Sequence, residues 1–553
     1  MGYRLGIDVG GTFSDFLLLS DNGDSEIYKV LSTPEDPSVG VLNGLKIMAG
    51  NKGVELEKFI EQIQIIVHGT TVTTNAVLTE KGVKTGLLTT KGFRDALQLR
   101  RGLKEEPYNN KYEGPTPIVP RYLRVPITER VNYLGEVLTP IDHQEVINGV
   151  NKFKKEECEA IAVCFMHSYV NHKNEVIISD IIKKELPEAY LTLSSELLPQ
   201  IGYYERTSST VLNSYVGPIL KKYLVSLIRR LNESGFKEVF LVMQSNGGVM
   251  TPSVAIKTAA STLLSGPAAG PIAGLSYAGT HGYEDCITID MGGTSFDVTL
   301  IKNKKPSIIT DGKIKGHLLA LPMLAIYTIG AGGGSIGWVD EGGLLHMGPQ
   351  SAGANPGPAC YNLWGKIPTC TDADLVLGYL NKDFFFGGKI PLDEKKAEEA
   401  IKKYIATPLS IGLIEAAYGM YQLINVNMAS AIKEVSVRRG YDPREFPLLV
   451  AGGAGPVHAG MIALELGIRM IIIPRESSVF CAVGMLMSDL KHDLVRTYHS
   501  LLPSLNIRKF KILINEMENE GYKILAEEKV PKDKVRYLYS CDMRYVGQFL
   551  TFQ

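Results

Sequence analysis

The chain has 553 residues, a net charge of −1, 45% hydrophobic residues and 21% charged residues, which is typical of a globular protein with roughly three or four domains. The balanced charge offers no basic surface to nucleic acid or to an anionic membrane. The sequence contains no run of 18 apolar residues, no signal-peptide core and no CxxC pair among its seven cysteines, so we expect a cytoplasmic protein without a zinc knuckle or a disulfide framework.

The first motif in the chain is DVGGTFSD at residues 8–15, which lies between two apolar runs. Residues 290–297 read DMGGTSFD, again between apolar runs, and repeat Asp, Gly, Gly, Thr and Asp at the same spacing. An apolar strand, a tight Gly-Gly turn and a second apolar strand predict a β-hairpin. Two copies so far apart indicate two related domains, each of which opens with its own hairpin.

The elements between and after these hairpins alternate in type. Strands are predicted at residues 62–68, 85–89, 159–166, 238–244, 447–451 and 470–474, and long helices at 207–231 and 413–438. Strands that alternate with helices indicate the α/β class. We expect Gly217-Pro218 to kink the first long helix, and the Gly/Pro-rich segments 113–120 and 348–358 to form ordered loops or lids.

The chemistry of the DxGGT turns favours phosphate binding. Paired glycines present backbone N–H groups with no Cβ in the way, and the Thr hydroxyl adds a further donor. The Asp at the strand end is an oxygen ligand suited to Mg²⁺. Two such hairpins facing each other would hold a triphosphate, and phosphoryl transfer needs little beyond positioning, metal and charge neutralisation. A β-turn capped by Asp explains one copy alone, but the matched pair favours phosphate loops.

Two further glycine clusters lie in the second half of the chain. GGAGPVHAG at 452–460 follows a predicted strand and opens a helix, which is the arrangement of an anion or nucleotide platform. GAGGGSIG at 330–337 matches GxGxxG but continues into Trp338-Val339-Asp340 rather than a clear helix, so a dinucleotide fold lacks its confirming context. No GxxxxGK[ST] occurs, which excludes a P-loop enzyme.

Many motifs in order make the chain resemble one family over nearly its whole length. They include DVGGTFSD, VHGTTVTTNAVL, GLLTTKGFRD, YERTSSTVLNSYVGP, SNGGVM, LLSGPAAGP, DMGGTSFDV, TIGAGGGSIGWVD, GPQSAGANPGPACY, TDADLVLG, AGGAGPVHA and VGMLMSDLKHD. Together they resemble the A-type subunit of the hydantoinase/oxoprolinase family, which includes N-methylhydantoinase, 5-oxoprolinase, lactam hydrolases and subunits of acetone and acetophenone carboxylases. The resemblance is specific for the family and not for a substrate.

The resemblance implies an α/β fold of the actin-like, sugar-kinase-like ATPase type, with duplicated ribonuclease-H-like domains and a partial C-terminal domain. The corresponding division of the chain is 1–190, 191–490 and 491–553. It implies ATP and Mg²⁺ as cofactors, phosphorylation of the amide carbonyl of a hydantoin, 5-oxoproline or lactam, and ring opening with a B-type partner in a hetero-oligomer. The alternatives are a subunit of an ATP-dependent ketone carboxylase and a non-catalytic actin-like nucleotide sensor.

The same resemblance assigns roles to individual residues. Asp8 and Asp290 would be the catalytic and metal-binding carboxylates. The expected cofactor-binding positions are Gly10, Gly11, Thr12, Gly292, Gly293, Thr294, Gly332, Gly333, Gly452, Gly453 and Gly455. Candidates for substrate contact are His68, Thr70, Thr71, Arg101 and Arg206. For His68 the alternative is a structural histidine bonded to a turn, and for Arg101 it is a charged surface face.

The chain departs from the family pattern in two places. It has GYYERT, with Gly202 where an arginine is common, and it stops at RYVGQFLTFQ, where related subunits continue for roughly another domain. We expect a strand at 543–546 and, because an exposed strand edge accepts pairing, a partner contact from about Arg496 onward. We also expect a helix to start at Asp372 and Asp374, with Thr371 or Asp372 as its cap, while the neighbouring PGPACY loop leaves a site role open for the two aspartates. His492 and Asp493 are expected to lie on a solvated surface.

Overall fold

The computed structural model describes residues 2–11, 13–33, 36–102 and 104–548. Its first sheet is built on the N-terminal hairpin, in which β1 (Tyr3–Val9) pairs antiparallel with β2 (Phe13–Ser20), and β3 (Ser25–Leu31) extends it. On the other side of β1 lies β4 (Ile63–Thr70), parallel to it, followed by the parallel β11 (Val239–Met243) and the short β12 (Val249–Met250). The strand order is β12-β11-β4-β1-β2-β3.

The second sheet repeats this plan. The hairpin of β13 (Cys286–Met291) and β14 (Phe296–Lys302) is extended by β15 (Lys305–Pro306), and β23 (Leu448–Ala451) and β24 (Ile471–Ile472) follow in parallel beyond β13. Each sheet therefore has three antiparallel strands continued by two parallel ones, in the order 3-2-1-4-5 within its own domain. This duplicated ribonuclease-H-like topology is that of the actin-like fold, so the fold class and the duplication predicted from the two DxGGT motifs are confirmed.

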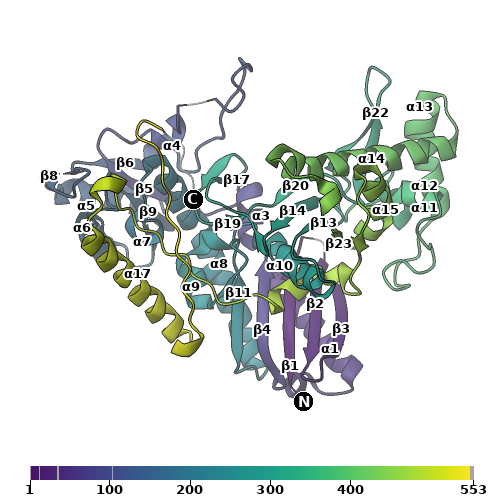
Figure 1. Ribbon diagram of the computed structural model, residues 1–553, viewed down its shortest axis with the longest axis horizontal. Coiled ribbons are helices and arrows are strands. Elements are labelled where there is room, and N and C mark those ends of the chain that lie inside the picture. The colour runs from purple at the N-terminus through teal and green to yellow at the C-terminus, as the bar shows by residue number, and fades with distance from the viewer. Residues whose placement is uncertain (1, 12, 34–35, 103, 549–553) are drawn as a thin grey trace.

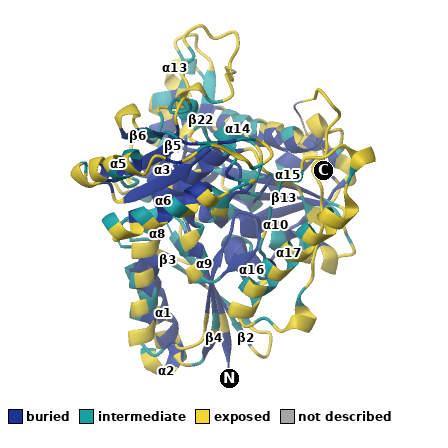
Figure 2. Ribbon diagram, turned by 90° about the vertical axis from the view of Figure 1, so that its left-hand side faces the viewer, coloured by how far each residue is buried: buried dark blue, intermediate teal, exposed yellow. Residues whose placement is uncertain are grey.

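Helices cover the two sheets and join them. The first core packs α1 (Pro37–Lys52) and the long α8 (Tyr203–Glu233) against β1 and β4, and the second packs α14 (Leu413–Val435) and α15 (Gly455–Leu466) against β13. Between the sheets lie α10 (Ser265–Thr280) and α16 (Phe480–Leu486), which are largely buried (Figures 1 and 2). They approach so closely that a Cβ at Gly484 would collide with the carbonyl group of Ala269.

A separate four-stranded sheet lies between β4 and β11 in the sequence. Its order is β10-β9-β5-β6, formed by β5 (Thr85–Thr90), β6 (Arg124–Ile127), β9 (Ala160–Cys164) and β10 (Tyr190–Leu193). Helices α5 (His143–Lys155) and α6 (Lys173–Glu185) contribute to its core. The strands predicted at 85–89 and 159–166 are thus confirmed. The proposed division of the chain at residue 190 stays a prediction.

The remaining elements are short, apart from the last helix. The other helices are α2 (Leu56–Ile60), α3 (Val72–Leu78), α4 (Ala96–Leu99), α7 (Ser194–Leu197), α9 (Pro252–Lys257), α11 (Cys370–Val376), α12 (Glu394–Ile401), α13 (Thr407–Leu409) and α17 (Ile507–Glu527). The small strand pairs are β7 (Arg130–Val131) with β8 (Val137–Thr139), β16 (Ile308–Ile309) with β19 (Met323–Leu324), β17 (Gly312–Ile314) with β18 (His317–Leu319), and β21 (Ser335–Val339) with β22 (Leu345–Ser351), while β20 (Tyr327–Ile329) pairs with β14.

The C-terminal segment differs from its prediction. Residues 543–546 form no strand. Instead α17 lies against the outside of the first half of the molecule (Figure 1), and its end is attached there because Glu528 accepts hydrogen bonds from the N–H and the hydroxyl of Thr251. His492 pairs with the same Glu528 at 2.6 Å and its side chain is 9% exposed, so its predicted place on a solvated surface is wrong. Within the part of the chain that the structure describes, no helix has the length and apolar character needed to cross a bilayer.

Candidate functional site

The two DxGGT hairpins have the same geometry. Asp8 lies opposite Asp15 across the first hairpin, and Asp290 lies opposite Asp297 across the second. Each turn is closed in the same way, because Gly10 N donates to Phe13 O (3.0 Å) and Gly292 N donates to Ser295 O (3.1 Å). A Cβ added to Gly11, Gly292 or Gly293 would meet nothing within 4 Å, so these turns are open on the side away from the strands. Thr12 lies outside the described residues.

The aspartates of the two hairpins face each other. Burial raises the pKa of Asp8 to about 7, and the negative charges of Asp15 and Asp290 act in the same direction. Burial likewise raises the pKa of Asp290 to about 6 and that of Asp297 to about 7. Since the charge of Asp290 affects the pKa of Asp8, and that of Asp15 the pKa of Asp290, the carboxylates of the two domains form one site. Oδ1 of Asp8 is buried and has no hydrogen-bond partner among the described residues, which fits a group that a cation completes.

Two residues that sequence reasoning missed lie beside these carboxylates. Cys481, on α16, donates a weak hydrogen bond to Asp290 (3.5 Å), and burial together with the charges of Asp290 and Asp8 raises the pKa of its thiol. Lys29, on β3, forms an ion pair with Asp15 (2.7 Å), and its positive charge lowers the pKa values of Asp8 and Asp290. Neither residue belongs to a glycine-rich motif, so no local pattern in the sequence points to them.

Three glycines allow other segments to reach the aspartates. A Cβ at Gly452, which has φ +83°, would lie 2.6 Å from Oδ1 of Asp290. A Cβ at Gly69, near the end of β4, would lie 3.2 Å from Oδ1 of Asp8, and one at Gly266, at the start of α10, would lie 3.5 Å from the same atom. The ends of β4 and β23 and the N-terminus of α10 therefore converge on the two carboxylates.

The GAGGG cluster packs directly on the second hairpin turn. Gly333 N donates to Gly292 O (3.1 Å), and Gly334 N donates to Gly293 O (2.7 Å). A Cβ at Gly332 would lie 2.7 Å from the carbonyl carbon of Gly293 and from Thr294 N, so only glycine fits there. The chain continues into strand β21 rather than a helix, which agrees with the rejection of a dinucleotide fold.

The GGAGP cluster forms a helix start at the same place. Gly455 begins α15, and Ala454 N donates to Met291 O (3.1 Å) at the end of β13. A Cβ at Gly453 would meet nothing within 4 Å. The structure thus brings together three glycine clusters that are far apart in sequence: the second DxGGT turn, the GAGGG loop and the GGAGP helix start.

The polar residues at the end of β4 lie at different depths. His68 is fully buried within β4, its Nε2 is hydrogen-bonded to the Tyr223 hydroxyl (2.9 Å), and burial lowers its pKa to about 3. This is the structural alternative rather than a substrate contact. Thr70 is also buried, and its Oγ1 accepts from Val72 N. Thr71 is partly exposed and lies close to Gly266, near Asp8, so it alone of the three remains a substrate candidate.

The two arginines are engaged elsewhere. Arg206 is 1% exposed, and its guanidinium donates to Ser168 Oγ (2.5 Å), Ser194 Oγ (2.8 Å) and Phe165 O (2.7 Å), so the expected substrate contact is replaced by a buried structural role. Arg101 is an exposed residue that pairs with Glu205 at 2.7 Å, which matches the surface alternative.

Ser265 was also missed by sequence reasoning. It is the first residue of α10, it is 1% exposed, and its Oγ has no hydrogen-bond partner among the described residues. The next residue, Gly266, is the one that approaches Asp8. Because the first N–H groups of a helix have no partner within the helix, this end of α10 adds donors beside the carboxylates, and these can donate to an oxygen of a ligand.

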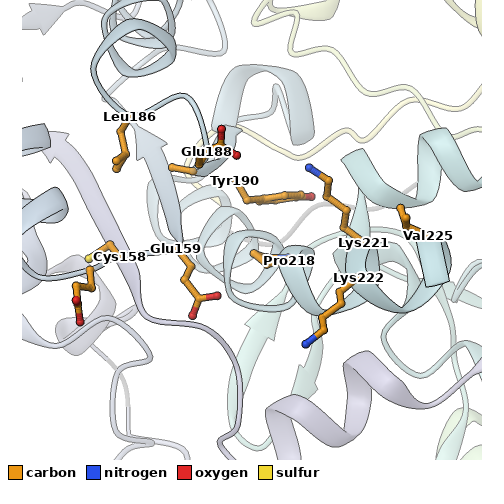
Figure 3. A pocket seen from close by; sticks show the side chains of 11 residues that line it. Cys158, Glu159, Leu186, Glu188, Tyr190, Pro218, Lys221, Lys222 and Val225 are labelled. Carbon is orange, nitrogen blue, oxygen red and sulfur yellow. The ribbon is translucent and has the colours of Figure 1, made fainter. Parts of the chain in front are cut away.

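A surface pocket lies away from this site. It has a volume of about 490 Å³ and lies near the N-terminal ends of β9 and β10, where Glu159, Tyr190, Pro218 and Lys221 line it (Figure 3). None of its eleven lining residues belongs to the glycine clusters or to the carboxylate set. The pocket therefore has no part in the candidate site.

The raised pKa values predict a pH effect on stability. The carboxyl of Asp8 has a pKa of about 7 in the folded chain against 3.8 for a free carboxyl, so the folded state binds more protons between these values, and this contribution to stability falls as the pH rises. In chelator-treated protein, Asp8→Asn should raise the free energy of unfolding by an amount of the order of a few kcal/mol at pH 8 and by clearly less at pH 5, where the folded carboxyl is protonated. Urea unfolding at both pH values measures this. An equal difference in the free energy of unfolding at the two pH values would show that burial does not raise the pKa of this carboxyl.

The fold and the site together define an actin-like protein with two hairpins that face each other across a carboxylate cluster. Family models described as hydantoinase/oxoprolinase and as its N-terminal region match residues 206–494 and 4–186. The chain therefore belongs to the hydantoinase/oxoprolinase family.

Known relatives span two activities. The chain is 38% identical to caprolactamase subunit alpha of Pseudomonas jessenii, over 99% of this chain and 79% of that one. It is 35% identical to the acetophenone carboxylase gamma subunit of Aromatoleum aromaticum, over 98% and 76% respectively. A crystal structure of the ATP-dependent caprolactamase superposes with a TM-score of 0.89, at 37% identity, over 99% of this chain and 80% of that one. The nucleotide-free structure of acetone carboxylase superposes with a TM-score of 0.83, at 29% identity, over 100% of this chain and 80% of that one.

Proposed function

We propose that this chain is the ATP-using subunit of a cyclic-amide hydrolase that phosphorylates the amide oxygen of its substrate. The observation that carries the proposal is the pair of carboxylates Asp8 and Asp290, which come from matched hairpins and lie close enough for the charge of Asp290 to raise the pKa of Asp8. The relative with 38% identity is named as a caprolactamase subunit, and its structure is described as ATP-dependent, which supports a lactam or a related cyclic amide.

In this proposal the open glycine turns hold the phosphates. The turns are open at Gly11, Gly292 and Gly293, where an added Cβ would meet nothing within 4 Å, and the start of α15 lies next to the second turn. Gly10 N and Gly292 N close the hairpins, so the other backbone donors of the turns and the helix N-terminus can bind the nucleotide. Asp8 and Asp290 would hold Mg²⁺, and the ion when bound would neutralise phosphate charge. The buried Oδ1 of Asp8, which has no partner among the described residues, fits that ligand set.

The acceptor would bind at the start of α10. Thr71 and Ser265–Gly266 lie beside Asp8, and the unpaired hydroxyl of Ser265 can donate to a carbonyl oxygen. The amide oxygen attacks the terminal phosphorus, the bond from that phosphorus to the ADP oxygen breaks, and ADP leaves. Water then adds to the activated carbon, and the ring C–N bond breaks as the nitrogen takes a proton, which leaves an acyl phosphate. A second water adds to the same carbon, its C–O bond to phosphate breaks, and the products are phosphate and the opened amino acid.

Substrate-dependent ADP release tests the proposal. The chain would be purified with a candidate B-type partner and supplied with MgATP and, in turn, with caprolactam, 5-oxoproline, a hydantoin, or a ketone plus bicarbonate. ADP release with a cyclic amide is the expected result. Release only with the ketone and bicarbonate would support the carboxylase alternative, which the acetophenone and acetone carboxylase relatives favour. Nucleotide binding without release under any condition would support the nucleotide sensor.

The GAGGG loop predicts a steric effect on nucleotide affinity. In Gly332→Ala the added methyl would lie 2.7 Å from backbone atoms of Gly293 and Thr294, so the turn that holds the phosphates must move. We expect the ADP affinity to fall by about tenfold or more, which corresponds to about 1.4 kcal/mol. Titration calorimetry with MgADP measures it. Gly279→Ala is the control, because its Cβ would meet nothing within 4 Å, and an equal effect of both variants would contradict the contact.

A further inference from the structure

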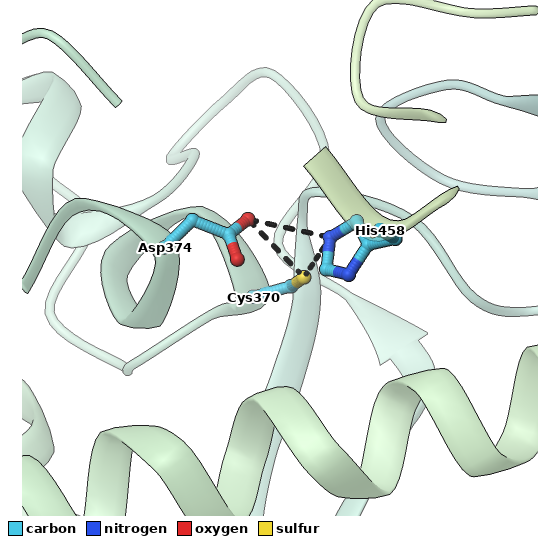
Figure 4. A group of neighbouring side chains, drawn as sticks. All are labelled: Cys370, Asp374 and His458. Carbon is cyan, nitrogen blue, oxygen red and sulfur yellow. Dashed lines mark hydrogen bonds and ion pairs between the residues drawn. The ribbon is translucent and has the colours of Figure 1, made fainter. Parts of the chain in front are cut away.

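A second cluster of ionisable side chains lies apart from the carboxylate site. Cys370 begins α11, Asp374 lies one turn later on the same helix, and His458 lies on α15 (Figure 4). The three ligand atoms form a triangle: Cys370 Sγ lies 3.4 Å from His458 Nε2 and 3.6 Å from Asp374 Oδ2, and the last two atoms are 3.5 Å apart. The exposed fractions of the three residues are 1%, 0% and 3% in the order Cys370, His458 and Asp374.

The capping of α11 leaves Asp374 available for this cluster. The N-cap is Thr369, and Asp372 completes a capping box with it, because Thr369 N and Oγ1 both donate to Asp372 Oδ2 (2.8 Å each). This corrects the expectation that Thr371 or Asp372 itself would be the cap. Since Cys370 and Asp374 are separated by four residues, they lie on the same face of the helix, and that face points at His458 (Figure 4).

Hydrogen bonds alone do not satisfy the three groups. If His458 carries its proton on Nε2, it can donate to Asp374 Oδ2, but Nδ1 is then a bare acceptor. If the proton is on Nδ1, it has no acceptor among the described residues, and Nε2 faces a carboxylate oxygen as a second acceptor. Nδ1 of His458 and Oδ1 of Asp374 are both buried without a hydrogen-bond partner in the described part of the chain. Buried polar atoms without partners are rare and need an explanation.

A cation at the centre of the triangle supplies that explanation. Zinc binds cysteine sulfur at about 2.3 Å and histidine nitrogen or carboxylate oxygen at about 2.0–2.2 Å in tetrahedral geometry, which places neighbouring ligand atoms about 3.3–3.6 Å apart. The three separations here lie within or next to that range. A thiolate and an imidazole select zinc over Mg²⁺ or Ca²⁺, in contrast to the all-oxygen pair Asp8 and Asp290.

We propose that Cys370, Asp374 and His458 form a buried zinc-type metal site that ties α11 to α15. The fourth position falls to Asp374 Oδ1 or to a water. Because its ligands are buried, the site has a structural role. It acts on the nucleotide loops through both helices: Thr371, beside Cys370, donates to Gly333 O from its N–H and its hydroxyl (2.8 Å each), and α15 begins at the GGAGP turn. The site itself does not depend on the proposed function.

Metal analysis of the full chain tests the proposal. Protein expressed with added zinc and passed through chelator-treated buffer should retain about one zinc per chain, and Cys370→Val and His458→Asn should each lose it. Cys286→Ala is the matched control, because Cys286 is a buried thiol in another cluster, and it should retain the metal. All variants would carry Cys541→Ala, since Cys541 is exposed and could bind metal adventitiously.

Cobalt binding to the wild-type chain tests the metal site even if a variant fails to fold. Co²⁺ added to the metal-free chain should give the thiolate-to-cobalt charge-transfer band and the strong visible bands of a tetrahedral site. Cys370→Val should lose the charge-transfer band, whereas Asp374→Asn should keep it with weaker cobalt affinity. Folded wild-type chain that neither retains zinc nor develops these bands, or a band that persists in Cys370→Val, would overturn the proposal. None of these measurements requires ATP turnover, so failure of the proposed function would appear separately.

Discussion

Asp290→Asn should lower the rate of phosphoryl transfer by about 100- to 1,000-fold and leave the nucleotide affinity nearly unchanged. The asparagine keeps the size of the side chain and can still accept the weak hydrogen bond from Cys481. The glycine turns that face free space and the helix start at Gly455 are untouched, so the phosphates remain bound. What is lost is the charge that places the metal. Single-turnover ADP formation measures the rate, and calorimetry with MgADP measures binding.

Asp297→Asn is the matched control for this prediction. Asp297 lies opposite Asp290 in the same hairpin, and its carboxyl bonds to the Thr328 hydroxyl at 2.5 Å. The oxygen of an asparagine side chain can accept the same hydrogen bond from Thr328, and the proposal gives Asp297 no contact with the metal. We expect a much smaller loss of rate than in Asp290→Asn. Near-normal turnover in Asp290→Asn would contradict the metal assignment, and Asp8→Asn should behave like Asp290→Asn.

The parts of the fold that sequence could predict are those with a local signal. The DxGGT hairpins are marked by Asp, paired glycines and flanking apolar strands, and both were found where predicted. The parallel strands β4, β11 and β23 are apolar runs between helices, and they too were predicted. The prediction of a strand at 543–546 was wrong: Met543 forms an isolated β-bridge, and Arg544 to Val546 do not continue it as a ladder. A short apolar stretch becomes a strand only when pairing extends along it.

The site could be predicted only where its residues lie in such motifs. Cys481 reaches Asp290 from 191 positions along the chain, and no spacing rule covers such a contact. Arg206 and His68 were misjudged for a related reason. Polar side chains usually lie at the surface, but α8 packs into the first core, so Arg206 and the Ser and Thr residues that follow it are buried. His68 lies in a strand that has neighbours on both edges.

The expectation that a second chain opens the ring depends on which water-activating groups the site contains. Opening the ring needs a group that activates water. Apart from the four hairpin aspartates, which the proposal gives to the metal and to the hairpin contacts, the groups described around Asp8 and Asp290 are Cys481, Thr71, Ser265 and Lys29. His68 is buried, and its pKa of about 3 leaves it a poor base near neutral pH. His458 belongs to the buried cluster with Cys370. The relatives named as subunits alpha and gamma support a hetero-oligomer.

The chain alone should therefore hydrolyse ATP slowly and open no ring, and full turnover should require a B-type partner. We expect the contact to involve the segment from Arg496 onward, where Leu538 and Val546 are 88% and 86% exposed, because apolar side chains so exposed gain most from being covered. Leu538→Glu with Val546→Glu should weaken co-elution with the partner and lower turnover, whereas Leu344→Glu, at a position that is 64% exposed on the β21–β22 hairpin, should do neither. Ring opening by the single chain at the rate of the mixture would refute the division of labour.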